Sequence, residues 1–228
     1  MTQEKLVEEK NQELKDVMVL KSTNVMYLCG MRAVGKSTLL AHLMNEMPRF
    51  VIYDGSTHQH GDKGIVVRNS SELDRAMKEG EKRIVCQPWQ DNEQVFDTFC
   101  KTIWENGNCH LAVEEIGNYL DAFKCPVYAD MIIRVGRNKG IGMTGINQRP
   151  ARIWNNFIAL TDHWFIFKTT LPRDVKFICE YIGDDKDRMI KELPDHYFIY
   201  MSAKTMKPIK CSPIKLKKEG ESHANKMP

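Results

Sequence analysis

The chain has 228 residues, of which 42% are hydrophobic and 28% are charged. This balance is typical of one globular domain and excludes a fibre or an intrinsically disordered chain. No stretch approaches ~18 consecutive apolar residues and the N-terminus is too polar for a secretory signal, so we expect a cytoplasmic protein and not a membrane protein.

The formal net charge of +3 is distributed unevenly. Residues 1–16 hold five acids against three lysines, whereas residues 203–228 hold seven lysines against two glutamates. The remainder is neutral, so charge alone does not indicate a nucleic-acid-binding protein. The seven cysteines are scattered and form no C-x-x-C pair, which argues against a disulfide framework or a cysteine-type zinc site and favours reduced, structural thiols.

The order of apolar patterns along the chain predicts one domain with two arms. Residues 1–22 are expected to form a charged helix or arm, residues 23–214 a single α/β domain, and residues 215–228 a basic, flexible tail. From Val25 onward, short apolar runs alternate with segments of helical period, which indicates a mainly parallel central sheet flanked by helices. The expected strands are residues 25–29, 50–53, 84–86, 111–113, 141–146, 164–167 and 197–201. The expected helices are residues 37–47, 92–105, a helix that Pro126 opens, and residues 174–182.

Residues 30–37 (GMRAVGKS) match the phosphate-binding pattern G-x-x-x-x-G-K-[ST], between an apolar strand and an amphipathic helix. Gly30 and Gly35 allow backbone dihedrals that turn successive N–H groups towards an anion. Lys36 would reach the β- and γ-phosphates of a nucleotide, and the Ser37 hydroxyl would bind Mg²⁺. The expected nucleotide-contacting residues are Gly30, Met31, Arg32, Ala33, Val34, Gly35, Lys36, Ser37 and Thr38.

Residues 55–64 are polar and contain glycine and histidine, which predicts an exposed loop. His58 and His60 could suggest a metal site, but no further ligand stands at a useful spacing. A solvated loop is therefore the preferred interpretation.

Residues 110–115 (HLAVEE) bring two carboxylates to the end of an apolar strand. A phosphate-loop protein needs a second strand that ends in an acid to hold Mg²⁺ through water, and we assign this role to Glu114, although aspartate is usual there. Glu115 would polarise the attacking water as general base. Two alternatives stay open: both acids could be solvated ends of an ordinary strand, or Asp54, at the end of another strand, could be the functional acid.

Residues 134–150 (RVGRNKGIGMTGINQRP) contain a strand that ends in polar amides. Gln148 could contact both the γ-phosphate and the attacking water and so report the state of the nucleotide. Arg137 precedes the strand, so it would point away from its own nucleotide and could reach that of a neighbour, where an arginine stabilises transition-state charge. Arg134 is a weaker candidate for the same role, and both arginines could instead be surface charges.

The succession GMRAVGKS, LAVEE and GRNKGIGMTGINQRP resembles the FtsK–HerA superfamily of DNA-translocating ATPases. The short length and the ending DHYFIYMSAKTMKPIK are similar, in particular, to the genome-packaging ATPases of tailless, membrane-containing icosahedral viruses. The resemblance covers about residues 24–214 and implies a RecA-like P-loop NTPase fold. It makes Lys36 and Ser37 phosphate and magnesium ligands, Glu115 the catalytic carboxylate, Gln148 the sensor and Arg137 the residue that acts in trans.

The same resemblance implies ATP and Mg²⁺ as cofactors, and a homo-oligomeric ring, usually a hexamer, that threads double-stranded DNA without regard to its sequence. A packaging role further implies capsid or membrane vertex proteins as partners. The expected location is the host cytoplasm or the packaging vertex of the virion.

Other functions stay open. A cellular or plasmid relative could pump DNA, although such proteins usually carry extra domains or membrane anchors, and a nucleotide-dependent switch could bind nucleotide with little turnover. The pair Glu115 and Gln148 argues against a switch, and the NQRP block argues against a nucleotide kinase. No base-reading motif separates ATP from GTP. The aromatic residues of the strand 164–167 are interpreted as core, with base stacking as the alternative.

Overall fold

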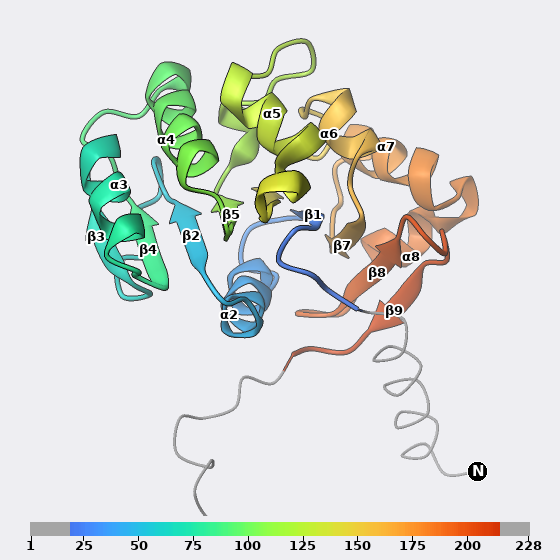
Figure 1. Ribbon diagram of the computed structural model, residues 1–228. Helices are drawn as coiled ribbons and strands as arrows, with labels where there is room; N and C mark the ends of the chain where they lie inside the picture. The colour runs from blue at the N-terminus through green and yellow to red at the C-terminus, as the bar shows by residue number, and fades with distance from the viewer. Residues whose placement is uncertain (1–18, 215–228) are drawn as a thin grey trace, which may run out of the picture.

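The computed structural model describes residues 19–214, which form one α/β domain around a nine-stranded sheet (Figure 1). The predictions for residues 1–18 and 215–228 therefore lie outside the described residues. The strands are β1 (Val25–Cys29), β2 (Phe50–Tyr53), β3 (Ile65–Val67), β4 (Arg83–Cys86), β5 (Cys109–Val113), β6 (Ile141–Asn147), β7 (His163–Phe167), β8 (Phe198–Ser202) and β9 (Ile209–Cys211). The α-helices are α2 (Lys36–Glu46), α3 (Ser70–Lys78), α4 (Glu93–Asn106), α5 (Val127–Val135), α6 (Asn155–Ala159), α7 (Pro172–Ile182) and α8 (Asp187–Lys191). Short 3₁₀ turns are η1 (Ile116–Asn118), η2 (Gly136–Lys139) and η3 (Asp184–Lys186).

The strand order is β3-β4-β2-β5-β6-β1-β7-β8-β9. All pairs from β3 to β7 are parallel, and β8 and β9 add an antiparallel edge. The central strands are buried along their whole length, which is why they read as continuous apolar runs without alternation. Because parallel strands all end at one edge, the loops after β1, β2, β5 and β6 lie side by side.

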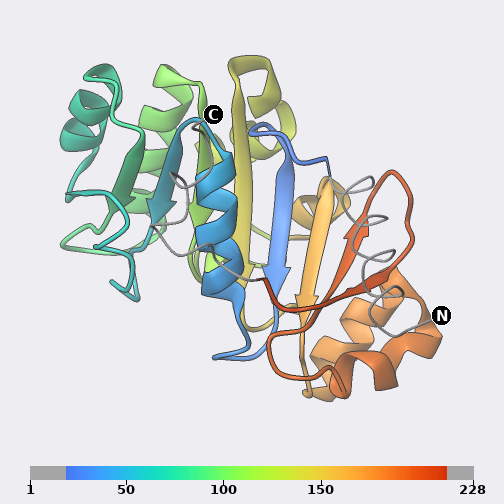
Figure 2. The ribbon, with the colours of Figure 1, turned by 90° about the horizontal axis from the view of Figure 1, so that it is seen from below.

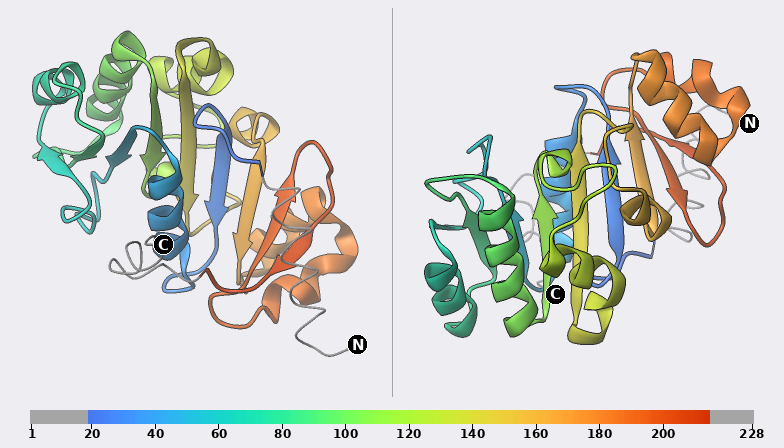
Figure 3. Two further views of the ribbon diagram at one scale, coloured as in Figure 1. Left: turned by 60° about the horizontal axis from the view of Figure 1, so that its bottom comes forward. Right: turned by 90° about the horizontal axis from the view of Figure 1, so that it is seen from above.

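Two apolar layers cover the sheet, and alternate residues of each strand enter opposite layers. Met26 and Leu28 of β1 pack with Leu39 and Leu43 of α2, and α2 covers that face of the sheet. Tyr27, one residue away, points into the other layer, which α3, α4, α5, α6 and α7 cover. Figure 2 shows α2 lying across its face of the sheet, and the two views of Figure 3 show α2 in front from one side and α4 and α5 in front from the other.

The predicted strands are all present, within a few residues of their expected bounds. The strands β3 and β9 were not predicted, because three residues at an edge of the sheet carry too little pattern. Helix α3 was also missed, although Asn69 and Glu72 form a capping pair at its start, with Asn69 Oδ1 accepting from Glu72 N at 2.9 Å. Helices α6 and α8 have five residues each and show no clear period.

The cysteines are free, and all but Cys125 are buried, as expected of structural thiols. Trp164 and Phe165 of β7 are buried, which confirms their interpretation as core. Among residues 19–214, no helix has the length and apolar character that crossing a membrane requires.

Candidate nucleotide-binding site

The loop between β1 and α2 has the backbone that the glycine pattern predicts. Gly30 has φ 142° and Gly35 has φ 105°, both in the region that favours glycine, and Ala33 also has a positive φ of 62°. A Cβ on Gly30 would lie 2.7 Å from Cβ of Phe167, so the end of β7 also requires glycine there. The loop is therefore shaped by two glycines and closely packed against the neighbouring strand.

Lys36 lies at the start of α2, buried within this loop. Its Nζ donates to the carbonyl oxygens of Gly30 at 2.9 Å and of Met31 at 2.6 Å. Burial lowers the pKa of Lys36, while the carboxylates of Glu115 and Glu114 act in the opposite direction. The ammonium group thus binds the turn of the loop and interacts electrostatically with the two acids that follow β5.

Ser37 and Thr38 are exposed at the first turn of α2, beside the positive end of the helix dipole. The Ser37 hydroxyl and the Glu114 carboxylate are oxygen donors, which are the ligands that Mg²⁺ takes in nucleotide sites together with phosphate oxygens. No group of three or more His, Cys, Asp and Glu suited to a metal occurs in the described part of the chain. The residues therefore fit a magnesium ion that arrives with a nucleotide better than a fully protein-bound metal.

Glu114 is buried, and its carboxylate is held by a residue that sequence reasoning assigned to a solvated loop. His60 Nε2 donates to Glu114 Oε1 at 2.7 Å, and only 4% of His60 is exposed. The prediction of an exposed loop over residues 55–64 is wrong for Gly55 and His60, which are buried, and the loop folds back onto the end of β5 to make this contact. Burial is the largest single effect and lowers the pKa of His60, but the hydrogen bond to Glu114 and the negative charges of Glu114 and Asp54 together raise the pKa above its ordinary value.

Asp54, the rival acid, is fully buried at the end of β2 and is occupied by its own loop. It accepts hydrogen bonds from the Thr57 hydroxyl, from His60 N at 3.0 Å and from Gln87 Nε2 at 3.0 Å. With three donors on its carboxylate, Asp54 fixes the loop geometry, and the carboxylates that raise the pKa of Lys36 are those of Glu115 and Glu114.

Glu115 is the second residue after β5 and adopts a left-handed backbone, with φ 46° and ψ 49°. Such a conformation is uncommon for a residue with a side chain and often marks a functional site. Gln148 Nε2, just after β6, donates to Glu115 Oε1. The structure thus brings the predicted general base and the predicted sensor into direct contact, at the same edge of the sheet as Lys36.

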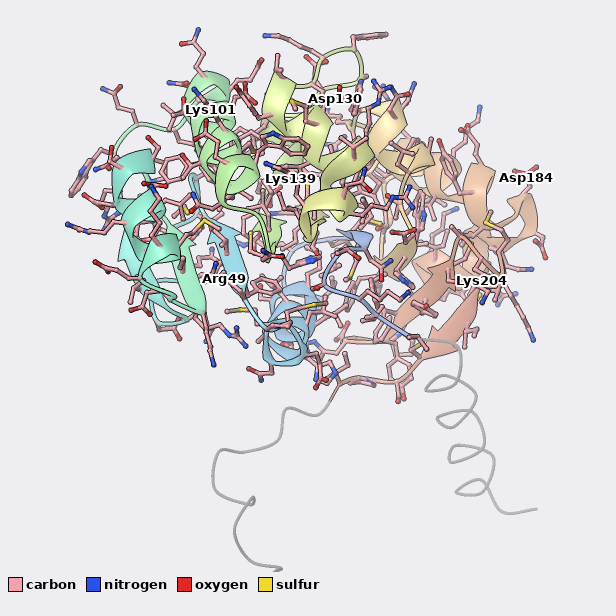
Figure 4. The ribbon with its side chains drawn as sticks, in the orientation of Figure 1. Arg49, Lys101, Asp130, Lys139, Asp184 and Lys204 are labelled. Atoms are coloured by element: carbon pink, nitrogen blue, oxygen red, sulfur yellow. The ribbon has the colours of Figure 1, made fainter. Side chains whose placement is uncertain are left out.

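Arg137 and Arg134 lie elsewhere. Both are exposed, on η2 and α5, and η2 precedes the start of β6, at the sheet edge opposite to the phosphate loop. Arg134 Nη1 lies 3.7 Å from Asp130 Oδ2, and Figure 4 labels Asp130 on α5 and Lys139 at the end of η2. The two arginines border a pocket of about 210 Å³. The role of either in a neighbour's site stays a prediction.

A hollow of about 260 Å³ lies beside Gly35 and Thr38, and sequence reasoning missed it. Its walls come from distant segments: Phe167 of β7, His196 and Phe198 before and within β8, and Pro213 and Ile214 after β9. Phe167 was expected to be core, and it is buried, but its ring also borders this space. The position next to the phosphate loop and the aromatic walls suit the base of a nucleotide.

Arg149, which follows Gln148, was quoted only as part of a motif, yet it makes a defined contact. Its Nε donates to Asp174 Oδ2 at 2.9 Å, and Ala151 N donates to Asp174 Oδ1 at 3.1 Å. Because Asp174 is buried in α7, this pair fixes the turn after β6 against that helix. Arg149 belongs to the quoted block that ends NQRP, but its partner Asp174 lies 25 residues further along the chain and no pattern predicts the pairing.

No family model and no curated protein sequence matches the chain. Solved structures are similar in fold. B204 from Sulfolobus turreted icosahedral virus 2, a genome packaging NTPase in complex with ATP-gammaS, aligns with a TM-score of 0.75 and 17% identity over 86% of this chain and 100% of that one. B204 from Sulfolobus Turreted Icosahedral Virus, a DNA-packaging ATPase, gives a TM-score of 0.73 and 18% identity, again over 86% and 100%. The plasmid coupling protein TrwB, in complex with the GTP analogue GDPNP, gives 0.61 and 12% over 90% and 92%.

At these identities the likeness shows a shared fold. It confirms the expected α/β architecture, a single P-loop NTPase domain with a mostly parallel sheet flanked by helices. The fold implied by the resemblance to the FtsK–HerA superfamily is therefore correct.

Proposed function

We propose that the chain is a Mg²⁺-dependent ATPase that uses hydrolysis to move double-stranded DNA, as a ring of identical subunits that packages a viral genome. The observation that carries this proposal is the grouping at one sheet edge of Lys36, Glu114, and Glu115 with its partner Gln148. Phosphate-binding and water-activating groups are the two requirements of nucleotide hydrolysis. The B204 proteins, which align over their whole length, are described as packaging enzymes, and this supports packaging over other uses of the fold.

In this proposal Lys36 exchanges its two carbonyl partners in the loop for oxygens of the β- and γ-phosphates. The N–H groups of the glycine loop and the start of α2 then stabilise the negative charge of the phosphates. Glu115 accepts a proton from the attacking water as its oxygen bonds to the γ-phosphorus, and the bond to the β–γ bridging oxygen breaks. The products are ADP and inorganic phosphate.

Gln148 has two tasks in the same proposal. Its amide now contacts Glu115, so it must release or share that carboxylate when water and the γ-phosphate enter. After hydrolysis the contact can form again, which links the conformation of the turn after β6 to the state of the nucleotide. Arg149 and Asp174 connect that turn to α7, so the change would be transmitted to the helices.

Magnesium would be held by the Ser37 hydroxyl and, through water, by Glu114. When bound, the ion supplies neutralisation of charge on the β- and γ-oxygens. The residues Met31, Arg32, Ala33, Val34 and Thr38 complete the proposed nucleotide contacts around Gly30, Gly35 and Lys36. The base would enter the hollow between Phe167, Phe198 and His196. ATP is proposed because the similar B204 structures contain ATP analogues, although TrwB contains a GTP analogue.

A ring is proposed because Arg137 lies at the sheet edge away from its own phosphate loop and could act on a neighbour's nucleotide. Residues 23–214 would form the ATPase domain, flanked by the charged arm and the basic tail. Capsid or membrane vertex proteins would be the docking partners, and the host cytoplasm or the virion vertex the place of action. The likeness to TrwB keeps a plasmid or cellular DNA pump as the second candidate.

The decisive experiment measures steady-state ATP hydrolysis of the wild-type protein with and without double-stranded DNA, beside Lys36→Ala as an inactive control. The proposal predicts turnover that DNA stimulates and that Lys36→Ala abolishes. Mg²⁺-dependent nucleotide binding with negligible turnover, even on DNA, would instead favour a nucleotide-dependent switch. Turnover indifferent to DNA would reject the translocase.

A further inference from the structure

The loop after β2 is organised by a buried carboxylate. Asp54 accepts hydrogen bonds from the side chain of Thr57, from the backbone of His60 and from the side chain of Gln87, which follows β4. These donors come from both ends of the loop turn and from a neighbouring strand. As a result the backbone at His60 is fixed relative to β2 and β4, although the residues before it, His58 and Gln59, are exposed.

The fixed backbone directs the His60 ring towards β5. His60 Nε2 donates to Glu114 Oε1 at 2.7 Å, and 5% and 9% of the two side chains are exposed. Glu114 Oε2 accepts no hydrogen bond from any residue between 19 and 214. One oxygen of the acid is thus committed to the loop, while the negative charge of Glu114 raises the pKa of Lys36 in the phosphate loop.

A buried hydrogen bond to a carboxylate is strong because both groups have lost water, and a buried carboxylate without a donor is costly. Glutamate also has one more rotatable bond than the aspartate that is usual at this position, so its carboxylate can take more directions. A fixed donor at one oxygen removes that freedom. This is the way in which partners of a metal-binding side chain orient it in other sites.

We propose that His60 is a positioning residue: held by Asp54, it sets the direction of the Glu114 carboxylate and so the coupling between Mg²⁺ and nucleotide binding. The proposal rests on the nucleotide site proposed above and adds a residue outside its motifs. His60 does not touch the nucleotide; it acts through Glu114. An unrelated structural role for the His60 loop would not depend on the length of the acid at position 114.

The test measures the affinity of a fluorescent ATP analogue over a series of Mg²⁺ concentrations. His60→Asn keeps a polar group but is too short to reach Glu114. We expect it to raise the Mg²⁺ concentration needed for half-maximal binding of the analogue about tenfold. The matched control is His58→Asn, the same change on the exposed part of the same loop, which should leave binding unchanged. His60→Gln, whose amide nitrogen can approach the place of Nε2, should retain binding within about threefold of wild type.

A double-mutant cycle with Glu114→Asp separates positioning from a structural effect. The shorter acid cannot meet His60, so adding His60→Asn to Glu114→Asp should change the affinity less than about twofold further. The proposal would be overturned if the losses of affinity in the two single variants multiplied in the double variant. It would also be overturned if His60→Gln showed a normal thermal transition but bound the analogue as weakly as His60→Asn does. If wild type itself binds the analogue without any Mg²⁺ dependence, the proposed nucleotide site fails, and this outcome is distinct from a normal wild type with a silent His60→Asn.

Discussion

His110 provides a prediction of stability that can be worked out from its contacts. It is fully buried on β5, with Nδ1 2.8 Å from the Ser22 carbonyl oxygen and Nε2 2.6 Å from the Thr144 hydroxyl oxygen. Because a carbonyl can only accept, Nδ1 carries the proton and Nε2 accepts from Thr144. The neutral ring is therefore satisfied, and burial lowers the pKa of His110 from 6.5 to about 4.

The sign of the effect follows from proton binding. The folded pKa of His110 lies below that of the unfolded chain, so on acidification the unfolded state binds the proton first. The free energy of unfolding is therefore unaffected above the unfolded pKa and falls as the pH drops through 6.5 towards about 4. Between pH 7 and pH 5 the expected loss is about 2 kcal/mol.

The assay is urea unfolding of wild type and His110→Gln at pH 7 and pH 5, followed by tryptophan fluorescence. Glutamine can hydrogen-bond but does not titrate, so the wild type should lose about 2 kcal/mol more than the variant over this interval. His60, whose pKa is raised, has an effect of opposite sign, but it is common to both proteins and cancels in the comparison. Equal losses in the two proteins would refute the reasoning.

Three further predictions concern the nucleotide site and its neighbour. Glu115→Gln should lower ATP turnover about 10²–10⁴-fold but retain binding of an ATP analogue, since it removes the base and leaves the phosphate loop; unchanged turnover would contradict this role. Arg137→Ala should lower turnover about 10³–10⁵-fold and regain part of it when mixed with Glu115→Gln subunits, whereas the matched Arg134→Ala should have a smaller effect; a silent Arg137→Ala would reject action in trans. Gly30→Ala should lower the free energy of unfolding by about 1–3 kcal/mol and prevent nucleotide binding, because its Cβ would meet Phe167 at 2.7 Å; calorimetry that finds an undiminished transition would show that the loop can adapt.

The residues of the site that could be predicted from the sequence are those that belong to short sequence motifs. Gly30 and Gly35 stand where the backbone of the loop must adopt a positive φ, and both have the positive φ that the motif requires. Glu115 and Gln148 are 33 residues apart, yet their contact could be expected, because each follows a strand of the same parallel sheet and β5 and β6 are neighbours. Residues that follow two neighbouring parallel strands lie close together even when they are far apart in sequence.

The residues of the site that were missed make contacts with distant residues, and no sequence pattern predicts those contacts. His60 contacts Glu114, 54 residues further along the chain, from a loop whose polar composition indicates exposure to solvent. Its burial depends on Asp54, which was weighed only as a rival acid and which accepts the hydrogen bonds that hold the loop. The hollow proposed for the base joins segments near Gly35, Phe167 and Ile214, so it exists only once β7 and β8 pair and the chain returns after β9.

The order of strands also determines how far the proposed groups can act. The residues after β5, β6 and β1 come from three consecutive strands, spaced about 5 Å apart, so Glu114, Glu115, Gln148 and Lys36 share one compact edge. Arg137 precedes β6, whose seven residues extend about 23 Å from one edge of the sheet to the other. That length exceeds the reach of an arginine side chain, so Arg137 cannot stabilise charge on a phosphate bound by its own loop. A role in hydrolysis for this residue therefore requires a second subunit whose phosphate loop faces η2, and the mixing experiment with Glu115→Gln tests that geometry directly.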